Sequence, residues 1–336
     1  MKLSVLDQSP LTIDSTYADA LANTQDLAQL ADQLGYHRYW VAEHHNSRSF
    51  AGSTPEVLIA NLAAATTGIK VGSGGVMMTH YSPLKVAENF HMLAALYPGR
   101  IDLGIGRAPG ADERTTAALQ AGPKKFTLDA FPAQVQLTLD YFKNGFPEDH
   151  PFHGIYATPI PQSAPEAWML GSGASSASIA AHLGLPFAQA HFISPEQAQE
   201  AVSYYRENFK PSATLDKPHV AMGVFALACD DEDAAAREAR IRNIWVLDFL
   251  SGKGGPFPSP AAVDARTLTP EQEQMLTQIE QRGIVGTSAQ VKERLDAMAA
   301  QFGLDEVIIV TITYDHQVRR RSYELLADAY GLTPRN

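Results

Sequence analysis

Hydrophobic residues along this chain follow two periods that alternate from one end to the other. Short runs rich in β-branched and aromatic residues are each followed by longer stretches in which apolar residues repeat every three or four positions. Strands are predicted at residues 3–7, 38–42, 70–78, 100–105, 167–170, 186–191, 220–229 and 306–313. Strands that alternate with helices are typical of a parallel sheet covered by helices.

The helical stretches carry start and stop signals. Apolar residues recur on one face of residues 17–34, and Gly35 follows as a natural C-cap. Helices are also expected to begin at Pro55 and Pro83, because each proline follows a hydroxyl residue that can cap a helix. Further helices are predicted at residues 132–142, 231–250, 288–301 and 319–330.

This order of elements predicts a closed barrel. Eight strands, each leading into helical sequence, indicate the α/β class and a (β/α)8 TIM barrel that forms a single domain over residues 1–336. A Pro/Gly-rich excursion over residues 144–165 precedes the fifth strand. The segment SGKGGPFPSPAAVDARTLTP, after the helix of the seventh strand, is interpreted as a surface insertion. In such barrels, functional residues gather at the C-terminal ends of the strands.

Charge and cysteine content narrow the range of partners. The formal net charge of −11 gives an acidic surface, which repels nucleic acid and anionic lipid, so we expect neither as a partner. The lone Cys229 lies in an apolar run, which is typical of a buried thiol in a reducing cytoplasm. The chain opens as a strand without a signal-peptide core, and no apolar run approaches the ~20 residues of a membrane span. We therefore expect a cytoplasmic protein.

The end of the second strand, YWVAEHH, offers the first candidate chemistry. His44 and His45 follow Glu43 at the strand end, and imidazole titrates near neutral pH, as proton transfer requires. Two other interpretations stay open, a polar loop without chemistry and a metal site. A metal would need ligands from further strand ends, and the sequence offers too few. We favour His44 and His45 as catalytic residues and predict no metal site.

Strands three and four end in residues suited to a flat, anionic cofactor. Ser73, Gly74 and Gly75 would let a planar ring lie against bare backbone, although a glycine bulge that only eases barrel curvature explains them equally well. Arg107 is a fixed cation directly after the fourth strand, suited to a phosphate or a flavin edge. The alternative is an arginine paired with the acidic residues that follow it.

The fifth strand ends in a candidate phosphate site. Gly171 and Gly173 break the strand, and Ala174, Ser175 and Ser176 open a helix. Free backbone N–H groups, two hydroxyls and the positive end of the helix dipole would together bind an anion. Serine is also common at helix starts that bind nothing, so the glycines before it are what favour phosphate.

The remaining candidate residues are assigned no chemical role. Ser9, Pro10 and Phe192 are expected to line the same mouth of the barrel. The remaining histidines are expected in solvated or capping positions, namely His37, His80, His91, His153, His182 and His316.

Five segments together resemble the bacterial luciferase-like monooxygenase family. They are YWVAEHH, VGSGGVMMTHYSPLKVAE, GRIDLGIGRAPG, LGSGASSASIAAHLGLPFA and IVGTSAQVKERL, in the family's order and covering most of the chain. The resemblance implies a (β/α)8 barrel that uses FMN. It places the catalytic histidine at His44, with His45 similarly placed, a non-proline cis peptide at Gly74-Gly75, and the phosphate-side arginine at Arg107. The phosphate-binding helix start falls on Gly173, Ala174, Ser175 and Ser176.

The chain departs from luciferase itself at two positions. The reactive cysteine of the light-emitting subunit matches Gly106, and the Glu-Ser pair before the phosphate-binding helix matches Ser172-Gly173. The resemblance therefore does not imply light emission. It implies backbone and serine contacts to the phosphate.

The resemblance also implies an activity and its partners. We expect a monooxygenase or related oxidoreductase that uses reduced FMN as a cosubstrate, with O2, on a small organic substrate. Because no NAD(P)H site is recognisable, a separate NAD(P)H:flavin reductase is expected. A homodimer is implied by family habit and by the nearly uncharged helix EVLIANLAAATTG. The alternatives are hydride transfer with the deazaflavin F420, a non-catalytic flavin carrier and, more distantly, a metal hydrolase.

Overall fold

Eight parallel strands form a closed barrel in the computed structural model, which describes residues 1–121, 128–143 and 145–335. The barrel order is β6-β5-β4-β3-β2-β1-β9-β7, and the pairing of β6 with β7 closes it. The strands are β1 (Lys2–Asp7), β2 (Arg38–Val41), β3 (Lys70–Met77), β4 (Ile101–Gly106), β5 (Glu166–Gly171), β6 (Phe187–Ala190), β7 (Val220–Cys229) and β9 (Glu306–Val310). The predicted TIM barrel is therefore confirmed.

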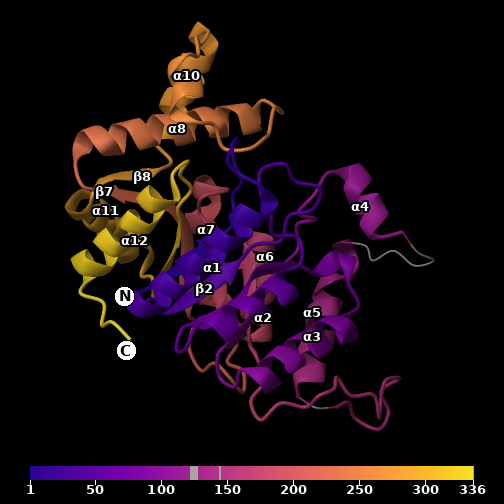
Figure 1. Cartoon of the computed structure of the whole chain (residues 1–336). Helices are drawn as coiled ribbons and strands as arrows, with labels where there is room; N and C mark the ends of the chain where they lie inside the picture. Colours follow the sequence, from indigo (N-terminus) through magenta and orange to yellow (C-terminus); the bar gives the residue numbers. More distant parts are fainter. Residues whose placement is uncertain (122–127, 144, 336) are drawn as a thin grey trace.

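Helices surround the barrel (Figure 1). They are α1 (Tyr17–Leu34), α2 (Pro55–Ala65), α3 (Pro83–Leu96), α4 (Glu113–Leu119), α5 (Phe131–Phe142), α6 (Ala174–Leu183), α7 (Ala198–Asn208), α8 (Glu232–Leu250), α9 (Pro260–Asp264), α10 (Pro270–Glu280), α11 (Ser288–Phe302) and α12 (His316–Tyr330). Gly35 ends α1 in the left-handed conformation, as predicted. Thr54 and Ser82 precede α2 and α3, but neither side chain makes a capping hydrogen bond. Among the described residues, no helix combines the length and hydropathy needed to cross a membrane.

The insertion after β7 is more ordered than its sequence indicated. Between α8 and α11 the chain forms α9, α10 and an extra strand, β8 (Ile284–Thr287). The ten-residue β7 is longer than the barrel needs. Its first half pairs with β9, and its last four residues pair with β8 beyond the rim. The predicted surface insertion over residues 251–270 contains α9, whereas β8 lies beyond it and was not predicted, because the short run IVGT forms a strand only by pairing with the far end of β7.

The excursion before β5 is irregular where the structure describes it, and residue 144 lies outside the described residues. It covers one side of α3, where the buried ring of His91 bonds the carbonyl of Ala157 at 2.8 Å. The prediction that His91 is solvated or capping is therefore wrong. The segment that buries it lies 66 residues further along the chain, so no local pattern revealed the contact.

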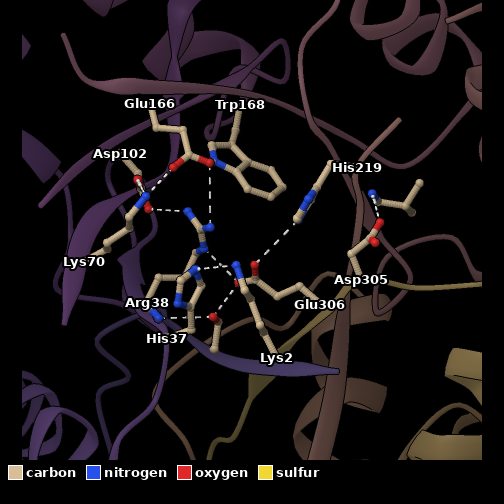
Figure 2. Close-up of polar contacts among 12 residues, drawn as sticks. Lys2, His37, Arg38, Lys70, Asp102, Glu166, Trp168, His219, Asp305 and Glu306 are labelled. Atoms are coloured by element: carbon tan, nitrogen blue, oxygen red, sulfur yellow. Dashed lines mark hydrogen bonds and ion pairs between the residues drawn. The ribbon is translucent and has the colours of Figure 1, made fainter. Parts of the chain in front are cut away.

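Charged side chains fill the barrel interior at the N-terminal ends of the strands (Figure 2). We call Arg38, Lys70, Asp102, Glu166 and Glu306 the base cluster. The Arg38 guanidinium lies 2.6 Å from Asp102 and 2.8 Å from Glu306, and it stacks over Trp168 at 4.5 Å. Lys70 pairs with Glu166. These residues occupy the first or second position of five strands, so opposite charges meet across the barrel axis.

Candidate active site

A cavity of about 250 Å³ opens at the C-terminal ends of the strands. Most of the barrel strands and the loops after β4 and β6 contribute to its wall, which is mainly apolar. Leu6, Trp40 and Phe192 are among its apolar lining residues. Five of the predicted cofactor-binding residues also line it, namely Gly74, Gly75, Arg107, Gly171 and Ser176. We call this space the mouth cavity. Its volume is just below the ~300 Å³ at which small-molecule sites begin.

The glycines of β3 form one wall of the mouth cavity. The peptide bond between Gly74 and Gly75 is cis, as expected, and the pairing with β4 shifts register directly after it. A Cβ on Gly74 would lie 2.5 Å from Leu6, and one on Gly75 would lie 2.7 Å from the carbonyl oxygen of Gly104. Both interpretations therefore hold together: barrel packing requires these glycines, and they leave bare backbone at the cavity wall.

Arg107 and the start of α6 form another part of the cavity wall and offer donors that suit an anion. Arg107 donates from Nη1 to Ser175 Oγ at 2.8 Å, which brings the loop after β4 to the start of α6. Gly173 is the N-cap of α6 and makes no side-chain capping bond, so the N–H groups of the first turn are left without a side-chain acceptor. A Cβ on Gly171 would collide with Ser176, so only glycine lets α6 begin this close to the strand.

His45 is held in a network at the rim. Its Nε2 lies 2.7 Å from the buried Glu43, which also accepts from the Tyr81 hydroxyl at 2.7 Å and from the Met77 backbone N–H at 3.0 Å. Burial raises the pKa of Glu43, although these hydrogen bonds oppose the shift. Because Met77 also lines the mouth cavity, the network joins the end of β2 to the cavity wall. Tyr81 and Met77 were not singled out in the sequence, since a tyrosine or methionine after a strand carries no specific signal.

His44 differs from its neighbour. Its ring lies against Phe50, with the ring centroids 4.5 Å apart, and its Nδ1 is buried without a hydrogen-bond partner among the described residues. Burial, helped by the charge of His45, lowers the pKa of His44 to about 4. His44 is therefore a neutral imidazole at pH 7, with one ring nitrogen free to accept or donate a proton.

Several predicted residues lie elsewhere. Ser73 points away from the cavity, and its buried hydroxyl bonds both the N–H and the carbonyl of Gly104, so it braces β3 against β4. Ser9 is also buried, with its backbone N–H bound to Asp7 and its Oγ accepting from Thr24, and neither it nor Pro10 lines the cavity. Within the described ranges, no group of three or more His, Cys, Asp or Glu side chains is placed to hold a metal ion.

The arrangement suits a planar nucleotide. A flat ring would lie among Trp40, Phe192 and the bare strand backbone, and its phosphate would reach Arg107 and the α6 start. The neutral His44 follows β2 at the same end of the barrel and can donate or accept a proton, but neither His44 nor His45 lines the mouth cavity.

Comparison with known protein families agrees with this geometry. A family model described as luciferase-like monooxygenase matches residues 1–306. The chain is 44% identical to the uncharacterized protein YwcH of Bacillus subtilis (strain 168), with 98% of this chain and 99% of that protein aligned. It is 40% identical to the luciferase-like monooxygenase of Escherichia coli (strain K12), over 97% of this chain and 96% of the relative.

Solved structures give the same result for the fold. The crystal structure of apo-MsnO8 superposes with a TM-score of 0.91 at 38% identity and covers 99% of both chains. The oxygenating constituent of 3,6-diketocamphane monooxygenase from the CAM plasmid of Pseudomonas putida, solved in complex with FMN, superposes with a TM-score of 0.73. At 18% identity, over 100% of this chain and 99% of that one, the second likeness shows the fold alone.

Proposed function

The chain belongs to the luciferase-like monooxygenase family, and on that premise we propose that it is an oxygenase that uses reduced FMN and O2 on a small organic substrate. The observation that carries the proposal is the mouth cavity, whose wall combines bare glycine backbone with Arg107 beside the start of α6, which no side chain caps. Reduced flavin, when bound, would supply the electrons that place one oxygen atom on the substrate and release the other as water.

The residues present fit the cofactor. The backbone N–H groups at the start of α6, Ser175, Ser176 and Arg107 would hold the phosphate. Gly74, Gly75 and Gly171 would let the ring system approach the strands closely, and Trp40 and Phe192 would exclude water from it. A solved relative of the same fold is in complex with FMN, which supports this choice of nucleotide.

The two histidines take different roles in this proposal. His44, with its lowered pKa and unpartnered Nδ1, would move the proton between substrate and solvent. His45, held by Glu43, would fix the end of β2 and so position His44. A pair of adjacent histidines with one free and one anchored is the arrangement expected when only one of them transfers a proton.

Two partners belong to the same proposal. A separate NAD(P)H:flavin reductase would supply the reduced FMN. A homodimer would cover the exposed apolar side chains of α2 and α3, where Val57 is 69% exposed and Leu96 is 59% exposed. Light scattering on the purified protein measures the oligomeric state directly, and a monomer at micromolar concentration would contradict the homodimer.

An anaerobic titration tests the cofactor. We expect photoreduced FMN to bind with micromolar affinity and F420 to bind at least tenfold more weakly, measured by flavin fluorescence. Gly171→Ala should weaken FMN binding about tenfold, because the added Cβ pushes Ser176 and the α6 start away from the phosphate. Gly255→Ala is the matched control, since its Cβ has only a contact at 4.0 Å.

The reaction of the reduced FMN complex with oxygen then distinguishes an oxygenase from a protein that only carries flavin. When the reduced complex is mixed with oxygenated buffer, flavin reoxidation should differ in rate from that of free FMN, and His44→Gln should change that rate. Absence of binding by reduced FMN would overturn the proposal. Binding combined with a reoxidation rate that His44→Gln leaves untouched would identify a flavin carrier instead.

A further inference from the structure

Arg242 on α8 is a buried cation without an acidic partner. The residue is 7% exposed, and no Asp or Glu among the described residues forms an ion pair with it. Its recorded hydrogen bond runs from Nη1 to Oδ1 of the adjacent Asn243, at 3.0 Å. Burial and the nearby charge of Arg282 lower the pKa of Arg242 to about 10, so it still carries its charge at pH 7. Buried charges in proteins are normally paired, and an unpaired one requires an explanation.

The position of Arg242 connects it with the mouth cavity. Its guanidinium lies over the ring of Phe225, 4.1 Å from the centroid. Phe225 lies two residues beyond Gly223 on β7, and its pairing partner Val310 lies two residues beyond Ile308 on β9. Gly223 and Ile308 line the mouth cavity. Because side chains two apart in a strand point to the same side, Phe225 and Val310 form the next layer above the cavity, and Arg242 lies over that layer.

The same helix also approaches His44. One turn after Arg242, the ring of Trp245 meets Phe50 at 5.8 Å, and Phe50 lies against His44. Ile241 and Ile244 of α8 belong to the same apolar cluster as Phe225 and Phe50. Figure 1 shows α8 crossing one end of the molecule. α8 therefore packs on a buried apolar and aromatic cluster above the mouth cavity, with the neutral imidazole of His44 at one side of the cluster and the unpaired cation at the other.

We propose that Arg242 binds the carboxylate of the organic substrate, whose apolar body lies in the mouth cavity on the other side of Phe225. Phe225 covers one face of the guanidinium, and the N–H groups lie in the plane of that group. Asn243 and Gly283 occupy the Nη1 side. The Nε and Nη2 edge has no acceptor among the described residues, and its two parallel donors match the two oxygens of a carboxylate. That the bound anion is a substrate rests on the proposed function, whereas the carboxylate site itself does not.

Binding of benzoate to the purified, flavin-free protein tests the site. Calorimetry should detect benzoate, and benzamide, its neutral counterpart of the same shape, should bind at least tenfold more weakly. Arg242→Met, which keeps the length of the side chain without its charge, should reduce benzoate affinity at least tenfold. Equal binding of benzoate and benzamide, or no benzoate binding at all, would overturn the proposal.

Gly283 allows the test to be repeated without removing the arginine. A Cβ at this position would lie 3.5 Å from Arg242 Nη1, an ordinary contact, so a short side chain fits. Gly283→Asp would supply an internal carboxylate and should abolish benzoate binding. Gly283→Asn has the same shape without the charge and should keep most of the affinity. Equal loss in both variants would show that the space matters and the charge does not, which contradicts the site.

Thermal stability distinguishes a binding residue from a structural one. If Arg242 exists to bind an anion, Arg242→Met removes an uncompensated buried charge, and Tm should stay level or rise by about 2–4 °C. If Arg242 only holds α8 in place, Tm should fall by a similar amount, and that result would overturn the proposal.

The anion could in principle be the phosphate of the nucleotide. Arg242→Met should therefore leave FMN affinity unchanged, and inorganic phosphate should not displace benzoate. A tenfold loss of FMN affinity with benzoate binding intact would reassign Arg242 to the cofactor. If reduced FMN fails to bind but benzoate binding follows the charge of residues 242 and 283, the proposed function fails and the carboxylate site remains.

Discussion

The two ends of the barrel interior treat buried charge in opposite ways. In the base cluster, Arg38 has Asp102 and Glu306 within 2.8 Å, and Lys70 has Glu166. At the mouth, Arg242 has no acidic partner and His44 has an unpartnered Nδ1 among the described residues. Both ends are buried and both contain an arginine stacked on an aromatic ring. Asp102 Oδ1 and Glu306 Oε2 of the base cluster also lack a hydrogen bond within the described part of the chain, so the difference lies in whether the protein supplies an opposite charge.

This difference teaches how to separate structural from functional polar groups. A charge that completes the fold must find its partner within the chain, because desolvation would otherwise cost several kcal/mol. A group that serves a ligand is left incomplete, and the rest of the fold offsets its cost. In TIM barrels the C-terminal ends of the strands carry function and the N-terminal ends carry stability, which is the division seen here.

Removing the arginine of the base cluster should give the largest effect. Arg38→Met leaves Asp102 and Glu306 buried without their cation, and we expect a loss of about 3–5 kcal/mol in the free energy of unfolding. Urea unfolding at pH 7 measures it. Arg321→Met is the matched control, because Arg321 is about half exposed and its pair with Asp230 should contribute less than about 1 kcal/mol.

The comparison predicts opposite results for the two buried arginines. Arg38→Met should destabilise strongly, whereas Arg242→Met should leave stability level or raise it. Similar losses in the free energy of unfolding of both variants would show that the unpaired Arg242 stabilises the fold as Arg38 does, which contradicts a ligand-binding role.

As pH falls, the groups at the mouth and those of the base cluster should lose their contributions to folding stability in different pH ranges. Burial and the charge of His45 lower the pKa of His44 to about 4, below the ~6.5 of a free histidine. Between these values the unfolded chain binds a proton that the folded protein excludes, so stability falls as pH falls, by on the order of 2 kcal/mol. His44→Gln should remove this loss between pH 7 and 5. The exposed His182→Gln should not, and urea unfolding at both pH values compares them.

The base cluster should respond only at lower pH. Burial raises the pKa of Glu306, but the nearby His219 ring at 3.9 Å, the charge of Arg38 and the hydrogen bond from Ser4 outweigh burial and bring the value to about 2. The stability that this pairing contributes is present above pH ~4.5 and is lost as pH falls toward 2, by on the order of 3 kcal/mol. A single acid transition shared by wild type and His44→Gln would argue against separate windows.

The fold and much of the mouth could be predicted because their signals are local. Strand and helix periods, and glycines next to serines at a strand end, occupy neighbouring positions in the chain, so Gly171 and Ser176 could be assigned to one site. Arg107 and Ser175 could each be identified because each follows a strand end, although the hydrogen bond between them, across 68 residues, could not be predicted.

The polar interior could not be predicted for the opposite reason. Arg38 and Glu306 are separated by 268 residues and meet only when the barrel closes. Arg242 lies in a helix whose charges look solvated in sequence, because burial depends on the extra strand β8, which was not predicted. Ser73 was assigned to the cofactor since its neighbours are glycines, but alternation along β3 turns its hydroxyl outward to Gly104.

Replacing Arg107 should have the smallest effect on stability, although Arg107 should contribute most to binding of the FMN phosphate. Arg107 lies at the exposed rim, so Arg107→Gln should change the free energy of unfolding by less than ~0.5 kcal/mol. FMN affinity should fall about tenfold, which corresponds to ~1.4 kcal/mol, whereas riboflavin, which lacks the phosphate, should bind wild type and variant equally. Ser175→Ala, which removes the acceptor that orients the guanidinium, should cause part of the same loss, and the double variant should lose less than the sum because both changes act on one contact. If riboflavin binding falls as much as FMN binding, Arg107 shapes the ring pocket and does not act on the phosphate. Arg107 would then have a structural role, as Arg38 has in the base cluster.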